Sequence, residues 1–166
     1  MTTPSDDLPT LYTIGVFGAD ETSFFQALLA AEIDTFCDVR QRRGVRGATY
    51  AFVNSQRLQA RLAELGIRYV HVKALAPTTA VRDAQKRADE EAGVAKRDRS
   101  KLSPAFVEAY EQECLADTEP NDVLDALPDD AESVVLFCVE REPAACHRSL
   151  AADWLAAGRP VTHLLP

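Results

Sequence analysis

The densest group of chemically reactive residues lies near the C-terminus, where the sequence reads CVEREPAACHR. Cys138 and Glu140 are two residues apart at the end of a predicted strand, so their side chains project to the same side. Cys146, His147 and Arg148 follow at the predicted start of a helix, where unpaired backbone N–H groups favour thiolates and bound anions. We expect these five side chains to share one catalytic site.

A nucleophilic thiol is the first chemistry that these residues suggest. Cys146 is a candidate nucleophile, with Glu140 or His147 as proton acceptor and Glu140 as candidate general base. Neighbouring residues on a helix do not face one another, so we expect His147 to point toward Cys138 or the third strand rather than toward Cys146. The residues six positions after Cys138 and Cys146 are alanines, which disfavours the arginine-closed anion loop of cysteine phosphatases and rhodaneses.

A zinc site is the second possibility. Cys138, Cys146 and His147, together with His71 or His163, offer thiolate and imidazole ligands, and a zinc ion with one open position would activate water. The sequence has no C-x2-C pair, and a free strand cysteine is most often buried for packing. We therefore expect no bound cofactor, with zinc as the alternative.

Candidate binding residues end the earlier strands. The first strand ends near Gly15, the second in Asp38 and Arg40, and the third near His71. In open α/β sheets the ligand binds beyond the carboxyl ends of the strands. We expect Arg40 and Arg148 to clamp a phosphate or carboxylate in bidentate fashion. The alternative is that Arg40 pairs with Asp38 or Glu140 and only holds two strand ends together.

The pattern of apolar residues predicts alternating strands and helices. Parallel strands need crossovers long enough to hold a helix, so this alternation is typical of a parallel sheet. Strands are expected at 11–17, 34–40, 67–72, 133–140 and 161–165, and helices at 20–31, 55–65 and 145–157. The predicted fold is a three-layer α/β domain over 1–166 with a mainly parallel five-stranded sheet and helices on both faces. A flexible leader is expected at 1–10 and a helical insert at 77–130, before the fourth strand.

Charge is distributed unevenly along the 166 residues. The net charge of −8 argues against a protein whose whole surface binds nucleic acid. Residues 35–101, however, carry fifteen bases and seven acids, whereas 102–166 carry three bases and thirteen acids. A local basic pocket would attract an anionic ligand while the acidic remainder limits indiscriminate phosphate binding.

The composition also bears on location. No apolar run approaches the roughly 20 residues that span a bilayer, and the first ten residues lack a basic and an apolar signal region. We therefore expect a cytoplasmic protein with no membrane partner. In that compartment the four cysteines would remain thiols. No pattern indicates an oligomeric state.

Several motifs occur in a characteristic order along nearly the entire chain. They are Thr13-Ile14-Gly15, Asp38-Val39-Arg40, Gly66-Ile67-Arg68-Tyr69 with His71, Cys138-x-Glu140, Cys146-His147-Arg148 and Val161-Thr162-His163. In order and spacing they resemble the domain of unknown function 488 family. The resemblance implies a compact α/β domain with a shared polar site, and it implies no established reaction. The sequence departs from the family pattern at Val16 and in the arginine-rich loop 41–47.

We therefore expect a small enzyme whose pocket of Arg, Cys, His and Glu side chains acts on an anionic substrate. The substrate class indicated is a small anion, a nucleotide or a nucleic-acid fragment. The alternatives are a non-catalytic nucleic-acid-binding module that uses the basic segment 40–101, a zinc enzyme, and an interaction protein that docks a partner through the helical region 80–127.

Overall fold

A five-stranded sheet forms the middle layer of the molecule in the computed structural model, which describes residues 8–93 and 101–166. Every pair of neighbouring strands is parallel, and the order across the sheet is β3-β2-β4-β1-β5. The strands are β1 (Thr10–Ile14), β2 (Thr35–Asp38), β3 (Arg68–His71), β4 (Ser133–Phe137) and β5 (Val161–Leu164).

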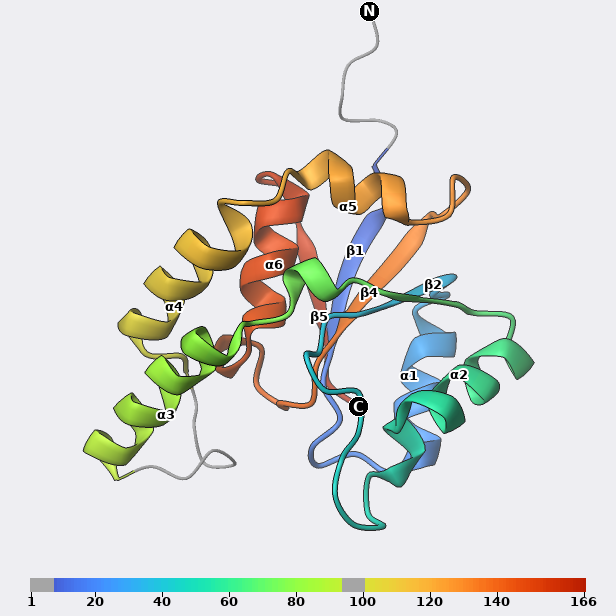
Figure 1. Cartoon of the computed structure of the whole chain (residues 1–166). Helices are drawn as coiled ribbons and strands as arrows, with labels where there is room; N and C mark the ends of the chain where they lie inside the picture. The colour runs from blue at the N-terminus through green and yellow to red at the C-terminus, as the bar shows by residue number, and fades with distance from the viewer. Residues whose placement is uncertain (1–7, 94–100) are drawn as a thin grey trace, which may run out of the picture.

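Helices cover both faces of the sheet, as Figure 1 shows. One face is covered by α1 (Glu21–Ala30) and α2 (Ser55–Glu64). The other is covered by α3 (Thr79–Ala92), α4 (Pro104–Tyr110), α5 (Pro120–Ala126) and α6 (His147–Ala156). The predicted three-layer α/β fold is confirmed, and the helical insert before the fourth strand consists of α3, α4 and α5.

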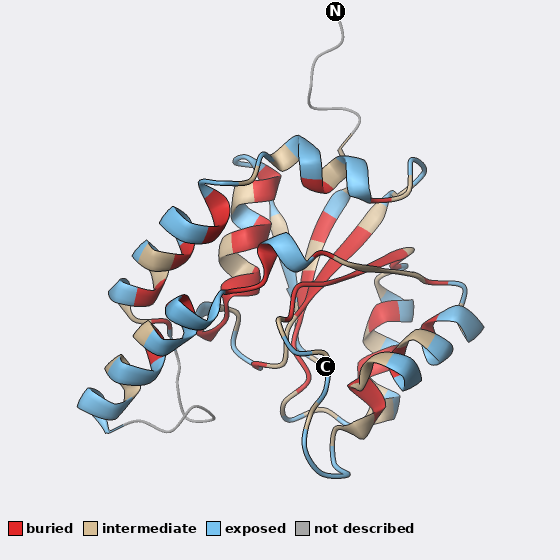
Figure 2. Cartoon of the chain, viewed as in Figure 1, coloured by how far each residue is buried: buried red, intermediate tan, exposed pale blue. Residues whose placement is uncertain are grey.

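The core is divided by the sheet into two clusters. Because side chains alternate along a strand, Phe36 belongs to the cluster under α1 and α2, while its neighbour Cys37 belongs to the cluster on the other face of the sheet. In Figure 2 the buried residues follow the strands and the helix sides that face them. The cluster under α1 and α2 is rich in aromatic rings, with Phe24 packed against Phe25, Phe36 and Phe137. This packing holds the carboxyl ends of β2 and β4 side by side.

Local signals fix the ends of several helices. Asp20 caps α1 by accepting the backbone N–H of Ser23 at 2.7 Å, while the Ser23 hydroxyl accepts the backbone N–H of Asp20. The Ser103 hydroxyl caps α4 by accepting the backbone N–H of Phe106 at 3.1 Å, and Pro104 occupies the first turn of that helix. Gly93 ends α3 with a φ of 69°, a left-handed conformation that glycine adopts without strain.

The strands are shorter than the sequence predicts, most clearly at their carboxyl ends. β2 ends at Asp38. The Asp38 carboxylate accepts the backbone N–H of Arg40 at 3.1 Å, so that N–H group is not available to a neighbouring strand. β4 ends at Phe137, so Cys138 and Glu140 lie in the loop after it. The expected leader 1–10 is partly wrong, since Thr10 already pairs with Ser133 in the sheet. Residues 1–7 of that leader lie outside the described residues, as do residues 94–100 of the insert.

No helix in the described ranges is long and apolar enough to cross a membrane.

Candidate functional site

A cleft of about 650 Å³ opens at the carboxyl ends of β2 and β4. The loop after β4 and the start of α6 contribute Cys138, Glu140, Cys146 and His147 to its lining. The loop after β2 and helix α3 contribute basic side chains, which are Arg42, Arg46, Arg82 and Lys86. Arg40 also lines this cleft. Four of the predicted catalytic residues therefore share one cleft with a basic rim.

Cys138, Cys146 and His147 form the chemical centre of this cleft. Their sulfur and ring nitrogen atoms all lie within 4.8 Å of one another. The Nε2 atom of His147 is 2.8 Å from the backbone carbonyl oxygen of Val39, so Nε2 carries the proton and donates it to that oxygen. The Nδ1 atom then faces the Sγ atom of Cys146 at 3.7 Å.

This contact corrects the expectation that His147 would turn away from Cys146. Adjacent helical residues diverge, but Cys146 is not helical: it is the residue before α6, with an extended backbone at φ −136° and ψ 143°. That conformation lets its side chain meet the imidazole of the first helical residue. The ring of Tyr110 packs edge-on against His147 with centroids 5.5 Å apart, which limits rotation of the imidazole.

The two thiols of the cluster differ in acidity. Burial raises the pKa of Cys146, but a hydrogen bond from Cys138 and the electrostatic interactions with His147 and Arg148 outweigh it, so the pKa lies well below the ordinary value. The hydrogen bond that Cys138 donates to Cys146, together with burial, raises the pKa of Cys138 well above the ordinary value. Cys146 is therefore the more acidic thiol of the pair.

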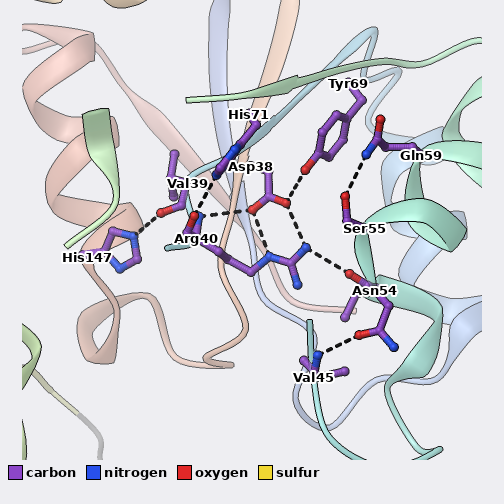
Figure 3. Close-up of polar contacts among 11 residues, drawn as sticks. Asp38, Val39, Arg40, Val45, Asn54, Ser55, Gln59, Tyr69, His71 and His147 are labelled. Carbon is purple, nitrogen blue, oxygen red and sulfur yellow. Dashed lines mark hydrogen bonds and ion pairs between the residues drawn. The ribbon is translucent and has the colours of Figure 1, made fainter. Parts of the chain in front are cut away.

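Asp38 and Arg40 form a buried ion pair beside the cleft (Figure 3). The carboxylate of Asp38 accepts the Nε–H of Arg40 at 2.9 Å and the Nη2–H at 2.8 Å, and it accepts the hydroxyl of Tyr69 at 2.6 Å. Arg40 also donates from Nη2 to the carbonyl oxygen of Val53 at 2.9 Å. Asp38 is fully buried by these partners and does not line the cleft formed by the described residues. Its carboxylate instead holds the Arg40 side chain in place.

Arg40 itself remains at the edge of the cleft, because it lines that cleft while its guanidinium is held by Asp38. Its Nη1 atom has no hydrogen-bond partner within residues 8–93 and 101–166. A buried donor without a protein partner commonly bonds to water or a ligand. The expectation that Arg40 contacts the substrate stays a prediction, now limited to this one nitrogen.

The sequence predicts that Arg148 binds an anion in the cleft, but the structure gives this side chain other partners. The side chain is fully buried, and its guanidinium donates to the carbonyl oxygens of Glu140 and Arg141. It does not line the cleft formed by the described residues. Arg148 therefore fixes the loop that carries Glu140, and it acts on Cys146 only through its charge.

Gly15 and His71 also support the site rather than line it. A Cβ atom on Gly15 would lie 1.8 Å from the carbonyl oxygen of Glu140, so the close approach of this loop requires glycine. The Nε2 atom of His71 lies 2.9 Å from the carbonyl oxygen of Arg40. The expected ligand contacts of Gly15 and His71 are therefore replaced by contacts with the two loops that border the cleft.

Glu140 lies at the junction of these contacts. Glu140 is 5% exposed and lines the cleft. Its backbone carbonyl oxygen lies against Gly15 and accepts a hydrogen bond from the Arg148 guanidinium. These contacts fix the backbone of Glu140 at the edge of the cleft.

Sequence reasoning missed several residues of the site. Tyr69 and Tyr110 read as ordinary apolar positions of a strand and a helix, although each orients a polar side chain of the site. Neither Arg82 nor Lys86 was singled out as a site residue, yet both line the cleft. No sequence pattern indicates that the backbone carbonyl of Val39 accepts a hydrogen bond from His147.

Cys138, Cys146 and His147 are also the group of described residues that could hold a metal ion. The other two histidines are engaged elsewhere. His71 contacts the Arg40 carbonyl, and Nδ1 of His163 lies 2.6 Å from the hydroxyl of Thr13. Neither His71 nor His163 belongs to this group of candidate ligands in the part of the chain that the structure describes.

A family model described as "Domain of unknown function DUF488" matches residues 21–155. The chain belongs to this family. No curated protein and no solved structure matches the chain. The range matched to DUF488 includes the Cys138-x-Glu140 and Cys146-His147-Arg148 motifs, while Thr13–Gly15 and 161–163 lie outside it. The DUF488 description names no reaction, so a function for this chain has to be argued from the cleft.

Proposed function

We propose that this DUF488 protein is an enzyme that hydrolyses a phosphate-bearing substrate, such as a nucleotide or a nucleic-acid fragment, bound in the cleft. The observation that carries the proposal is that reactive side chains and basic side chains line the same cavity. Reactive groups come from the segment after β4, and basic groups come from the loop after β2 and from α3.

The basic groups are the proposed anion-binding side. Arg42, Arg46, Arg82 and Lys86 are exposed and line the cleft, so their charged ends are available to a ligand. Guanidinium groups match the oxygen geometry of phosphate better than an ammonium does. Tyr50 lines the same cleft and packs against Phe17, which offers an aromatic surface to a base. A cavity of about 650 Å³ is in the range of small-ligand sites.

The reactive groups are the proposed catalytic side. Glu140 acts as general base toward a water molecule, and Cys138, Cys146 and His147 surround the position at which that water is activated. Glu140, Cys146 and His147 are buried, and the low local dielectric strengthens electrostatic effects on the reacting atoms. We place the protein in the cytoplasm as part of this proposal, because reducing conditions keep the four cysteines as thiols.

The alternative of a nucleic-acid-binding module has less support. Several bases of segment 40–101 lie far from the cleft lining and are paired with acids: Arg57 with Glu21, Arg61 with Glu64, and Arg68 with Asp34 and Asp130. Such pairing reduces the positive potential that a phosphate backbone would meet.

Ligand binding can be tested by calorimetric titration with adenosine monophosphate and with inorganic pyrophosphate. The double variant Arg42→Ala, Arg46→Ala is expected to weaken binding at least about tenfold, because charge-assisted hydrogen bonds contribute about 1.5–3 kcal/mol each. The matched control is Arg57→Ala, Arg61→Ala, which removes the same charge from exposed positions outside the cleft lining and is expected to bind normally. Equal weakening by both double variants, or wild-type protein that binds neither anion, would refute the proposal.

Catalysis can be tested by following release of phosphate or nucleoside from a panel of nucleotides and oligonucleotides. The wild-type protein is expected to hydrolyse at least one of them, and Glu140→Gln is expected to lower kcat about 100-fold or more while leaving ligand affinity within a few-fold. A Glu140→Gln variant with unchanged kcat on that substrate would remove Glu140 from the mechanism.

A further inference from the structure

We propose that Cys138, Cys146 and His147 bind one Zn²⁺ ion whose fourth coordination position opens into the cleft. The inference deepens the proposed function, because it names what activates the water, and it relies on that proposal for the position of the substrate. Three features support zinc binding: the separation of the ligand atoms, the orientation of the His147 imidazole, and the position of the three residues in the cleft lining.

The separations match a tetrahedral zinc site. Zinc bonds of about 2.3 Å to sulfur and about 2.0 Å to nitrogen place neighbouring ligand atoms roughly 3.5–3.8 Å apart. The Cys146 Sγ atom and the His147 Nδ1 atom are 3.7 Å apart, within that range. All three candidate ligand atoms lie within 4.8 Å of one another, so side-chain shifts of about 1 Å complete the geometry.

The imidazole of His147 has the orientation that a zinc ligand needs. Zinc-bound histidines almost always donate their other ring N–H to a carbonyl or carboxylate, which fixes the tautomer. Here Nε2 donates to the Val39 carbonyl at 2.8 Å, so the lone pair of Nδ1 points toward the thiols. The Tyr110 ring packed on the imidazole holds this orientation.

The surroundings favour two thiolates on a divalent cation. Cys146 and His147 lie at the amino end of α6, where backbone N–H groups stabilise negative charge. Two thiolates and one Zn²⁺ make a neutral site, so burial of the cluster costs little in desolvation. The other two thiols, Cys37 and Cys114, are buried outside the cleft lining and have no place in this cluster.

Three protein ligands and one open position are typical of catalytic zinc sites. All three residues line the cleft, so water or substrate can occupy the fourth position. In the proposed step a zinc-bound water gives a proton to Glu140, and the hydroxide attacks phosphorus. The P–O bond to the leaving group breaks, and the leaving oxygen takes the proton from Glu140. Water and a phosphate ester thus yield an alcohol and a phosphate.

The experiment is elemental analysis of the purified, reduced full-length protein after expression with zinc in the medium. The expected result is roughly one zinc per chain. The variants Cys138→Ser, Cys146→Ser and His147→Ala are expected to lose it, whereas the control Cys114→Ser removes a buried thiol outside the cluster and is expected to keep it. Circular dichroism of each variant verifies folding.

A spectroscopic measurement on wild-type protein makes the test independent of whether the variants fold. Replacement of zinc by Co²⁺ is expected to give intense visible d–d bands of a tetrahedral ion and near-ultraviolet thiolate-to-cobalt charge-transfer bands. A weak octahedral spectrum without charge transfer, a wild-type protein that takes up no zinc when reduced, or full zinc content in all three ligand variants would overturn the inference.

The same samples separate the two proposals. The Arg42→Ala, Arg46→Ala variant is expected to keep its zinc while losing affinity for the nucleotide. Zinc bound by a wild-type protein that binds no phosphate ligand would contradict the proposed function alone. Hydrolysis that continues at the full rate after a chelator has removed all metal would contradict the zinc inference alone.

Discussion

The buried pair of Asp38 and Arg40 links the end of β2 to the cleft. Both residues are almost fully buried, and the carboxylate also accepts the Tyr69 hydroxyl. A buried ion pair adds little net stability over an apolar pair, but removal of one partner leaves a buried charge that is uncompensated. The pair therefore acts as a constraint on the Arg40 loop rather than as a source of large net stabilisation.

We predict a strong coupling between these two positions. Arg40→Met alone is expected to lower the free energy of unfolding by about 3–5 kcal/mol, because it leaves the Asp38 carboxylate buried without its cation. The double variant Asp38→Leu, Arg40→Met is expected to lose less than Arg40→Met alone. Urea denaturation of the two single variants and the double variant measures this coupling, and additive losses would contradict the argument.

Gly15 is a second single-residue constraint, because the Glu140 carbonyl occupies the space that a side chain would need. Gly15→Ala is expected to lower the unfolding free energy by about 3 kcal/mol or more, since the clash involves backbone that cannot rotate away. Gly44→Ala serves as the control: its Cβ would meet only the Asn54 side chain at 3.7 Å, and a change within about 0.5 kcal/mol is expected. Equal stability of both variants in urea would exclude the proposed close approach.

At this scale the sequence predicted residue identities better than residue roles. It indicated Cys138, Glu140, Cys146 and His147, and all four line one cleft. It assigned ligand contacts to Arg148, which instead binds the carbonyls of Glu140 and Arg141. A side chain's type and spacing do not specify which backbone carbonyl will lie opposite it, so such partners are beyond what a sequence pattern can predict.

At the scale of elements, Asp34 joins the amino ends of three strands. Its carboxylate accepts the backbone N–H groups of Glu132 and Ser133, both at 2.9 Å, next to β4, and it is paired with Arg68 of β3. Partial burial raises the pKa of Asp34, but the hydrogen bonds from Thr35, Glu132 and Ser133 and the charge of Arg68 outweigh it. The pKa is therefore lowered from 3.8. This carboxylate stabilises the fold only when it is ionised.

The stabilisation by Asp34 is accordingly predicted to depend on pH. Because the folded pKa is lowered, the contribution is present above about pH 4 and is lost as the pH falls through the folded value. Asp34→Asn is expected to cost roughly 1 kcal/mol at pH 7, a modest value because the side chain is partly exposed. Urea denaturation at several pH values tests this, with the exposed Asp125→Asn as a control that shows no such loss. A penalty for Asp34→Asn that is the same at pH 3 and pH 7 would rule it out.

The elements themselves were largely predictable, whereas their order in the sheet was not. The alternation of apolar runs located most strands and helices, and in the structure Asp20 and Ser103 cap two of those helices. Hydrophobic patterns do not say which strand lies beside which, and it is the place of β4 between β2 and β1 that brings His147 to the Val39 carbonyl. The central contact of the site therefore depends on topology that no local signal encodes.

At the scale of the whole molecule, the proposal of a small anionic ligand agrees with the net charge of −8 and with the arginine and lysine side chains that line the cleft. A long duplex would meet a molecule of net negative charge, which repels phosphates. We therefore propose a ligand small enough to fit within the cleft.

We therefore predict weak binding of double-stranded DNA at physiological salt. Fluorescence anisotropy with a labelled duplex is expected to show no saturation at low micromolar protein, because few phosphates can be neutralised at once. Tight binding that falls steeply with added salt and disappears in the Arg42→Ala, Arg43→Ala, Arg46→Ala triple variant would favour the nucleic-acid-binding module instead.

The most direct test of the central claim is a crystal structure of the reduced, zinc-loaded protein soaked with a nucleoside monophosphate, with anomalous data collected at the zinc edge. We predict one anomalous peak about 2.0–2.4 Å from the Sγ atoms of Cys138 and Cys146 and the Nδ1 atom of His147. We also predict the phosphate in the cleft between that peak and Arg42 or Arg46. Clear density for the three side chains without a peak between them, and with the nucleotide bound elsewhere, would contradict the account.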